Sequence, residues 1–171
     1  MFLRAVACFV SICVVIGGKH GPWRNYGGKQ YLLIDQELTW YDAQTVCQTY
    51  GGHLAHANSK SKNDFLISLT DSSDWVWLGG SDLHKEGDWK WVNPERSMTF
   101  TFWSTTGPQP NNGRVSNCMC FWLAEAGYMW ADEPCTRKYL SICEREELGN
   151  SDDSGYRNSG KENEKCMKIC L

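Results

Sequence analysis

The apolar positions in the first third of the chain recur with two different periods. Residues 30–35, "QYLLID", form a short apolar run that includes an aromatic and a β-branched side chain, and they predict a strand. From Thr39 to Tyr50 the apolar residues instead recur every three or four positions. This predicts an amphipathic helix that Thr39 caps and a pair of glycines ends. A second helix is expected after Ser59, with one apolar face formed by Phe65, Leu66 and Leu69.

The rest of the pattern predicts short strands around a long irregular segment. Residues 74–80, "DWVWLGG", form a brief apolar run that its glycines are expected to stop, and residues 88–92, "DWKWV", alternate as a strand does. Gly, Pro, Asn, Ser and Thr dominate residues 98–117, so little regular structure is expected there. Three more short strands are expected at residues 118–123, 128–132 and 138–144. Two helices followed by many short strands predict an α+β domain.

The two ends of the chain differ from its middle. Arg4 precedes an apolar run at residues 5–16, which is shorter than the roughly 20 residues that a membrane-spanning helix needs. Residues 1–18 are therefore interpreted as a signal peptide, and the mature protein is expected to be secreted, with no membrane span. Residues 19–145 are expected to form one domain. Residues 146–171 are polar and charged up to a final pair of cysteines, which predicts a flexible tail.

Charge and composition exclude several classes of function. The formal net charge of the chain is −3, which gives no basis for binding nucleic acid or an anionic membrane. No Ser-His-Asp order, phosphate-binding loop or pair of catalytic carboxylates stands out, so an enzyme is not expected. His53 and His56 have a spacing that could serve zinc, but no third ligand is evident, and a structural role is the preferred interpretation.

Six motifs, in order along the chain, resemble the C-type lectin-like domain and secreted invertebrate lectins, including the perlucin-like proteins of mollusc shell. The motifs are "LTWYDAQTVCQTYGGHLA", "WLGGSD", "EGDWKWV", "PQPNN", "MWADEPC" and "CTRKYLSICE". The resemblance implies a fold in which two helices pack on short antiparallel sheets with a long irregular loop. It departs from the long form of the family at the N-terminal hairpin, where Lys19 and Gln30 occupy the positions expected to be cysteines.

The resemblance also implies two disulfides, which pair Cys47 with Cys143 and Cys118 with Cys135. Removal of the signal peptide leaves seven of the nine cysteines, so at least one thiol stays free or pairs between chains. Cys120 follows Cys118 by two positions and shares its face of a strand, so it is either a buried thiol or a partner for the tail. A homodimer linked by a disulfide through Cys120, Cys166 or Cys170 stays open.

In the family a calcium ion at the long loop shares its coordination shell with sugar hydroxyls. The resemblance assigns the calcium and carbohydrate ligands to Gln109 and Asn111, on either side of a cis-proline, and to Asp132. Two further ligand positions are changed, because Ser116 stands where an acidic residue is expected and Ala131 where an asparagine is expected. A site with one carboxylate and two amides is expected to bind Ca²⁺ weakly. The sequence Gln-Pro-Asn is intermediate between the mannose-type and galactose-type motifs, so the sugar stays undecided.

An auxiliary calcium site of some family members maps onto Asp82, Glu86, Asn112 and Asn117, although the two acids could equally be ordinary surface charges. The preferred function is recognition of glycans by residues 107–117 and Asp132, in an innate-immune or secretory setting. The alternative is a calcium-independent module that binds protein or mineral, which Ser116 and Ala131 favour.

Overall fold

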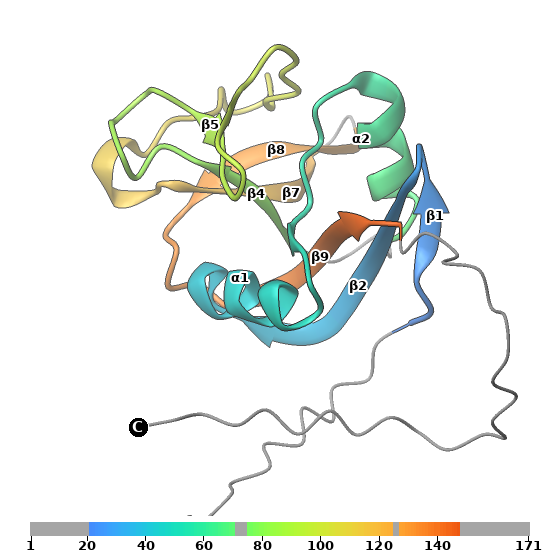
Figure 1. Ribbon diagram of the computed structural model, residues 1–171. Coiled ribbons are helices and arrows are strands. Elements are labelled where there is room, and N and C mark those ends of the chain that lie inside the picture. Colours follow the sequence, from blue (N-terminus) through green and yellow to red (C-terminus); the bar gives the residue numbers. More distant parts are fainter. Residues whose placement is uncertain (1–20, 71–74, 125–126, 148–171) are drawn as a thin grey trace, which may run out of the picture. The chain divides into compact units, whose positions relative to one another are not determined.

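The computed structural model describes residues 21–70, 75–124 and 127–147 (Figure 1). The expected signal peptide and nearly all of the expected tail lie outside these residues, as do Cys166 and Cys170. The described part contains two α-helices and one mixed sheet of nine strands.

Both helices begin where the sequence predicts. Helix α1 spans Trp40–Thr49, and the hydroxyl of Thr39 accepts a hydrogen bond from the backbone N–H of Asp42 at 3.2 Å. Helix α2 spans Lys60–Ile67, and Ser59 caps it in the same way. Such caps satisfy backbone donors that no helical carbonyl can reach. The predicted apolar face is only partly correct, because Leu66 is buried whereas Leu69 lies beyond the end of α2.

The strands form a sheet with a branched order. One path runs β1 (Arg24–Tyr26), β2 (Lys29–Leu38), β9 (Tyr139–Glu146), β4 (Val76–Ser81), β5 (Lys90–Trp91) and β6 (Arg96–Ser97). Off this path, β3 (His53–Leu54) pairs with β9, and β7 (Cys118–Ala124) pairs with both β4 and β8 (Gly127–Glu133). The sheet differs from the expected antiparallel form in one place, because β4 and β9 are parallel. Helix α1 packs beside β2, β3 and β9 (Figure 1).

The N-terminal hairpin forms without the disulfide that the long form of the family carries. Strands β1 and β2 pair through a turn in which Gly27 and Gly28 have φ values of 57° and 74°, a region that favours glycine. On this hairpin the side-chain amide of Gln30 donates to the Asn25 side chain at 3.2 Å, and its oxygen accepts from Arg145 at 3.0 Å. Polar contacts at Gln30 therefore hold the position where a cysteine was expected.

The expectation that glycines end the strand at residues 74–80 is wrong. The strand continues through Gly79 and Gly80 to Ser81. A Cβ atom on Gly79 would lie 2.6 Å from the Leu54 carbonyl oxygen, and one on Gly80 would lie 2.6 Å from a side-chain carbon of Met119. These glycines let other segments approach the strand closely, which is a common reason for glycine within a strand.

The core confirms both expected disulfides and contains several large aromatic side chains. Disulfides link Cys47 to Cys143 and Cys118 to Cys135. Trp77, Trp91 and Trp130 are fully buried. Trp75 and Trp122 are half-buried and stack on each other with ring centroids 6.0 Å apart.

Cys120 is a buried free thiol. Its Sγ donates to the Ala131 carbonyl oxygen at 3.6 Å, and burial raises the pKa of the thiol well above its usual value. This outcome confirms one of the two expected roles. Because its side chain is inaccessible, Cys120 cannot bridge to a second chain in this conformation.

Candidate functional site

The long loop is tied to strand β8 at its first residues. Trp103 forms an isolated bridge with Trp130, and the backbone N–H of Ser104 donates to the Trp130 carbonyl at 2.9 Å. The backbone N–H of Gln109 then donates back to the Ser104 carbonyl at 3.0 Å, and the Gln109–Pro110 peptide is cis, as expected. The loop thus holds Gln109 at a defined position close to the sheet. Beyond it, the described backbone is irregular except for a single 3₁₀ turn at Gly113–Val115.

Asp132 secures the second half of the loop. This residue of β8 is only 1% exposed, and its two carboxylate oxygens accept the backbone N–H groups of Asn111 at 3.0 Å and Asn112 at 3.1 Å. The structure therefore brings Asp132 directly against the Asn111 backbone, with Gln109 two residues away on the other side of the proline. Each carboxylate oxygen keeps a further lone pair, so these hydrogen bonds leave coordination capacity at Asp132.

Two other oxygen atoms of the loop are buried and lack hydrogen-bond partners among the described residues. They are Gln109 Oε1 and Ser116 Oγ. A buried polar atom without a partner costs about 1–3 kcal/mol, so such atoms call for a water molecule or an ion. From the sequence, Ser116 is only the loss of an acid. Its position two residues before Cys118 was the signal, but only burial shows that the hydroxyl oxygen points inward.

Asp82 forms a second buried carboxylate close to Asp132. It is 2% exposed; its Oδ2 accepts the Gly87 N–H at 2.9 Å, and its Oδ1 has no described partner. Burial, and to a smaller degree the charge of Asp132, raise the pKa of Asp82. Among the described residues neither carboxylate forms an ion pair with Lys, Arg or His.

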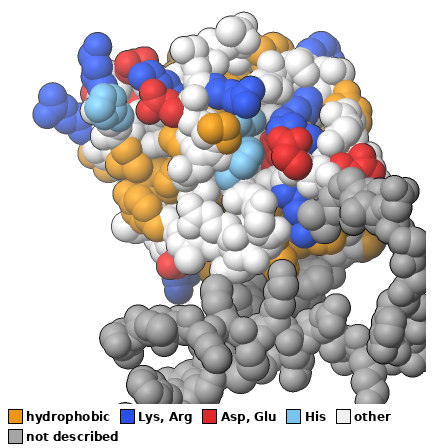
Figure 2. All heavy atoms as spheres, in the orientation of Figure 1, with side chains coloured by type: hydrophobic (Ala, Val, Ile, Leu, Met, Phe, Trp, Pro, Cys, Tyr) orange, Lys and Arg blue, Asp and Glu red, His pale blue; other side chains and the backbone are white. Residues whose placement is uncertain are grey.

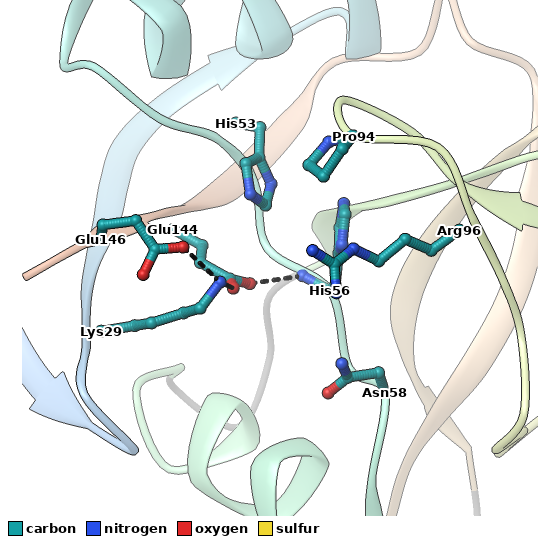
Figure 3. Close-up of a pocket in the computed structure, with 8 residues that line it drawn as sticks. All are labelled: Lys29, His53, His56, Asn58, Pro94, Arg96, Glu144 and Glu146. Carbon is teal, nitrogen blue, oxygen red and sulfur yellow. Dashed lines mark hydrogen bonds and ion pairs between the residues drawn. The ribbon is translucent and has the colours of Figure 1, made fainter.

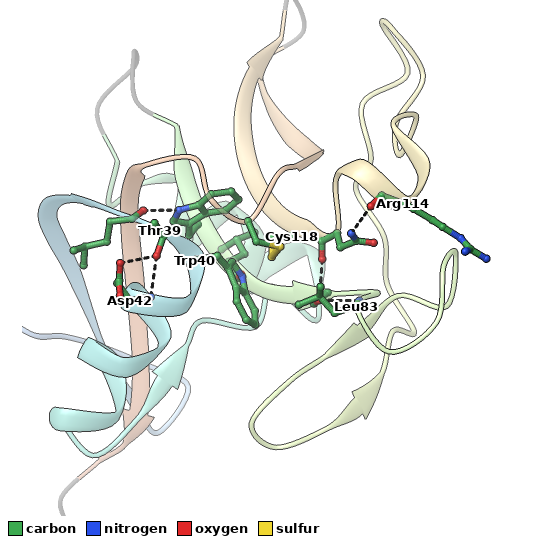
Figure 4. Close-up of a disulfide and its surroundings, with 12 residues drawn as sticks. Thr39, Trp40, Asp42, Leu83, Arg114 and Cys118 are labelled. Carbon is green, nitrogen blue, oxygen red and sulfur yellow. Dashed lines mark hydrogen bonds between the residues drawn. A yellow bond between two sulfur atoms is a disulfide. The ribbon is translucent and has the colours of Figure 1, made fainter. Parts of the chain in front are cut away.

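The remaining auxiliary residues lie around Asp82 with mixed geometry. The Asn117 carbonyl accepts hydrogen bonds from Ser81 Oγ at 2.8 Å and from the Asp82 N–H at 3.3 Å, so Asn117 contacts Asp82 through the backbone. Its side-chain amide instead donates to the Arg114 carbonyl at 3.0 Å (Figure 4). Glu86 and Asn112 are exposed, and Glu86 Oε1 lies 3.9 Å from the position a Cβ atom would take on Gly113.

The candidate ligand atoms are of the kind that calcium prefers, but few of them carry a negative charge. Every candidate ligand atom is an oxygen, as Ca²⁺ requires, and two of the carboxylates are buried without a basic partner. Nevertheless, the described residues contain no group of three or more His, Cys, Asp or Glu side chains arranged to hold a metal. Ala131, which is buried beside Asp132, offers no side-chain ligand. The described residues therefore support a weak oxygen-ligand site rather than a tight one.

Comparison with known proteins gives a consistent picture. A family profile described as the lectin C-type domain matches residues 36–145. A perlucin-like protein of Mytilus galloprovincialis is 32% identical over 71% of this chain and 79% of its own length. Lectin BRA-3 of Megabalanus rosa is 33% identical over 74% of this chain and 77% of its own length.

Among solved structures, a Ca²⁺-dependent type II antifreeze protein in its Ca²⁺-free form superposes with a TM-score of 0.66. It is 32% identical, over 72% of this chain and 96% of that chain. Within residues 21–70, 75–124 and 127–147, no helix is long and apolar enough to cross a membrane.

Proposed function

Because the chain belongs to the lectin C-type domain family, we propose that it binds carbohydrate through residues 107–117 and Asp132, with the help of a weakly held calcium ion. The family relationship supports the general function of a non-enzymatic lectin. The particular site and its dependence on calcium belong to this proposal.

One observation carries the proposal more than any other. Asp82 and Asp132 are both almost fully buried, interact electrostatically, and have no basic partner among the described residues. Burying a carboxylate without a compensating positive charge is costly, so buried charges in proteins are paired or coordinate metals. A divalent cation beside the loop would compensate both carboxylates, and Gln109 Oε1 and Ser116 Oγ could reach it without losing any hydrogen bond in the described residues.

The chain's own residues have distinct roles in this scheme. Asp132 orders the loop through the Asn111 and Asn112 amides. Asn111 is exposed, and its side-chain amide can both donate to and accept from sugar hydroxyls, whereas Gln109, whose Oε1 is buried, offers them only its amide N–H groups. Calcium, when bound, supplies open coordination positions that two neighbouring hydroxyls of a sugar can fill. Gln109 and Asn111 together match neither the mannose-type nor the galactose-type motif, so the proposal extends to glycans but not to one sugar.

The affinity for calcium is expected to be low. Calcium affinity rises with the number of charged ligands, and Ser116 and Ala131 replace two ligand positions with uncharged side chains. A Kd of about 10⁻⁴–10⁻³ M, the range of extracellular modules, is therefore expected. Such a site would fill in a calcium-rich extracellular fluid, which agrees with the proposed signal peptide at residues 1–18 and with secretion for glycan recognition in innate immunity.

Calorimetric titration with CaCl₂ tests the metal site. Asp132→Asn and Asp82→Asn are each expected to weaken or abolish binding, because each removes a buried carboxylate. Asp88→Asn is the matched control, since Asp88 lies in the same β4–β5 connection but is 44% exposed at its side chain. If the protein binds no calcium at millimolar concentration, or if Asp88→Asn has the same effect as Asp132→Asn, the metal site is wrong.

A glycan array with and without a chelator then tests the function. Binding that the chelator abolishes, and that Gln109→Ala and Asn111→Ala weaken, is the expected result. Calcium binding without any glycan binding would overturn the carbohydrate assignment while leaving the metal site intact.

A second candidate function is a calcium-independent module that binds protein or mineral. The loss of two ligand side chains at Ser116 and Ala131 favours it, as does the structural likeness to a calcium-independent type II antifreeze protein, which is 25% identical with a TM-score of 0.66. Chelator-insensitive capture of a protein or mineral surface, together with an empty glycan array, would support this alternative.

A further inference from the structure

A cavity lined by polar side chains shares no residue with the proposed calcium and glycan site. It has a volume of about 50 Å³ and lies between β2, β3, β9 and the β5–β6 turn (Figure 3). Its lining residues are Lys29, His53, His56, Asn58, Pro94, Arg96, Glu144 and Glu146. On the face drawn in Figure 2, basic, acidic and histidine side chains lie close together.

Glu144 is the buried charge of this cavity, and two lysines neutralise it. Its side chain is 1% exposed; Oε1 lies 3.0 Å from Lys29 Nζ and Oε2 lies 2.7 Å from Lys62 Nζ. The backbone N–H of His56 also donates to Oε2, at 3.0 Å. Lys29 Nζ in addition lies 2.9 Å from the carboxylate of Glu146, which is 80% exposed at the rim. Both carboxylates of the cavity are thus already paired with ammonium groups.

The two histidines add no charge near neutral pH. His53 Nδ1 donates to the Leu54 carbonyl and His56 Nε2 donates to the Val92 carbonyl, each at 2.8 Å. Burial lowers the pKa of both, that of His56 to about 4. Their ring centroids lie 4.3 Å apart with the planes tilted by 38°, and no third metal-binding side chain joins them among the described residues. This geometry agrees with a structural role and gives no support to a zinc site.

Arg96 gives the cavity one positive charge that no carboxylate balances. Its guanidinium makes no hydrogen bond or ion pair with any described residue, and its side chain extends toward the cavity from β6 (Figure 3). Lys62 does not line the cavity, but its ammonium pairs with Glu144, which does. With Lys62 included, three cationic side chains, Lys29, Lys62 and Arg96, accompany the two carboxylates of Glu144 and Glu146. The net charge of one positive unit favours a ligand group that carries a single negative charge.

We propose that this cavity binds an oxyanion, and that its occupant is a sulfate ester carried by a polysaccharide. The planar fork of Arg96 matches the oxygens of such a group, Lys29 keeps one N–H beyond its two ion pairs, and Asn58 lines the same cavity with an amide.

A sulfate ester fits these donors better than the other common oxyanions do. It has three terminal oxygens for the three donors, and its single charge balances Arg96. A phosphate monoester would bring about −1.5 to −2 charges next to Glu144 and Glu146, and a carboxylate offers only two oxygens. A polysaccharide repeats the group along its chain, so that several weak contacts with this partly open cavity can add up to useful avidity.

The test measures binding of the full chain to dextran sulfate and to unsubstituted dextran. It is done in EDTA and about 150 mM salt, so that the calcium site does not contribute and long-range electrostatics are screened. Arg96→Gln is expected to weaken binding of dextran sulfate by about ten-fold, because it removes a charge-assisted pair of hydrogen bonds. Arg137→Gln, which removes an exposed arginine that does not line the cavity, is the matched control and should change the affinity by less than about two-fold.

A second pair of variants tests the rim of the cavity. Glu146→Gln frees Lys29 and removes a repelling carboxylate, so it is expected to strengthen binding. Glu147→Gln changes the net charge equally at the neighbouring position but does not line the cavity, so it should have a smaller effect.

Three results would overturn the proposal. The first is equal weakening by Arg96→Gln and Arg137→Gln, which would indicate general attraction to a polyanion. The second is equal binding of carboxymethyl dextran, which would rule out a preference for sulfate. The third comes from NMR with inorganic sulfate, which should shift the His53 ring signals more than chloride does at the same ionic strength; identical spectra in the two salts would rule out an oxyanion in the cavity.

Discussion

The buried carboxylate of Glu144 offers a direct test of how this fold is stabilised. Replacing Glu144 with Gln leaves the ammonium of Lys62, which is 10% exposed at its side chain, without its partner. Removing one member of a buried ion pair typically costs about 3–5 kcal/mol, because the other charge stays buried and uncompensated.

The pKa of Glu144 gives a second measure of how much the ion pair stabilises the fold. The ion pair and hydrogen bonds with Lys62, the His56 N–H and Lys29 lower this pKa from 4.5 to about 2, although burial alone would raise it. A lowering by between two and three units corresponds to about 3 kcal/mol of stability. Because the folded-state pKa is the lower one, this stability is fully present above pH 4.5 and is lost as the pH falls toward 2.

The pKa of Lys62 is lowered, although an ion pair by itself would raise the pKa of an ammonium group. Burial lowers it, which means that desolvation outweighs the attraction to Glu144 for the ammonium. The stability of the ion pair is best measured at acid pH, because there Lys62 stays protonated and only the carboxylate of the pair titrates. Acidification also destabilises both proteins through His53 and His56, whose pKa values burial lowers. The charge of Glu144 raises both of these pKa values, so the histidine contribution differs between the two proteins until both histidines are protonated.

Urea denaturation at a series of pH values provides the assay. At pH 7 Glu144→Gln is expected to lower the free energy of unfolding by about 3 kcal/mol, and the gap should narrow as the pH falls below 4 and the wild-type carboxyl is protonated. Glu146→Gln is the control, because Glu146 pairs with Lys29 at the surface and should cost less than about 1 kcal/mol. A gap that stays constant from pH 7 to pH 2.5, or a loss at pH 7 no larger than that of the control, would refute the reasoning.

Three further predictions concern other parts of the molecule. Gly79→Ala is expected to destabilise the protein by about 1–3 kcal/mol in urea denaturation, because its Cβ would lie 2.6 Å from the rigid Leu54 carbonyl; an unchanged midpoint would contradict this. Ser116→Asp restores an acid at the loop and should tighten calcium binding about ten-fold in calorimetry, whereas weaker binding in a folded variant would count against a metal site there. Cys120 should resist a thiol-directed alkylating reagent until the protein is unfolded, as followed by mass spectrometry of its peptide, and rapid labelling of the native protein would show that the thiol is not buried.

The features predicted best from the sequence were those set by neighbouring residues. Thr39 and Ser59 each cap a helix because their hydroxyls reach an N–H three positions further along the chain. The two disulfides came from the family resemblance rather than from spacing, since seven cysteines allow many pairings. The prediction that glycines end β4 was wrong. Glycine is needed there because the Leu54 carbonyl and the Met119 side chain, which are distant along the chain, pack closely against the strand.

For the candidate site, the sequence identified the types of ligand, and the structure showed what surrounds them. Gln109, Asn111 and Asp132 were named from the motif alone, but nothing in the motif showed that Asp132 binds the loop backbone or that Ser116 turns its hydroxyl inward.

The amino-acid sequence specifies the order of the elements, their caps, the kinds of side chain in the long loop, and the small net charge. Which charges meet depends on how the elements pack against one another. Lys29, Lys62 and Glu144 come from β2, α2 and β9, and their ion pairs span 82 and 115 positions of the chain. Hydrophobic periodicity and capping act within a turn or a strand, whereas desolvation and Coulomb attraction depend on distances that exist only after the sheet has closed and excluded water.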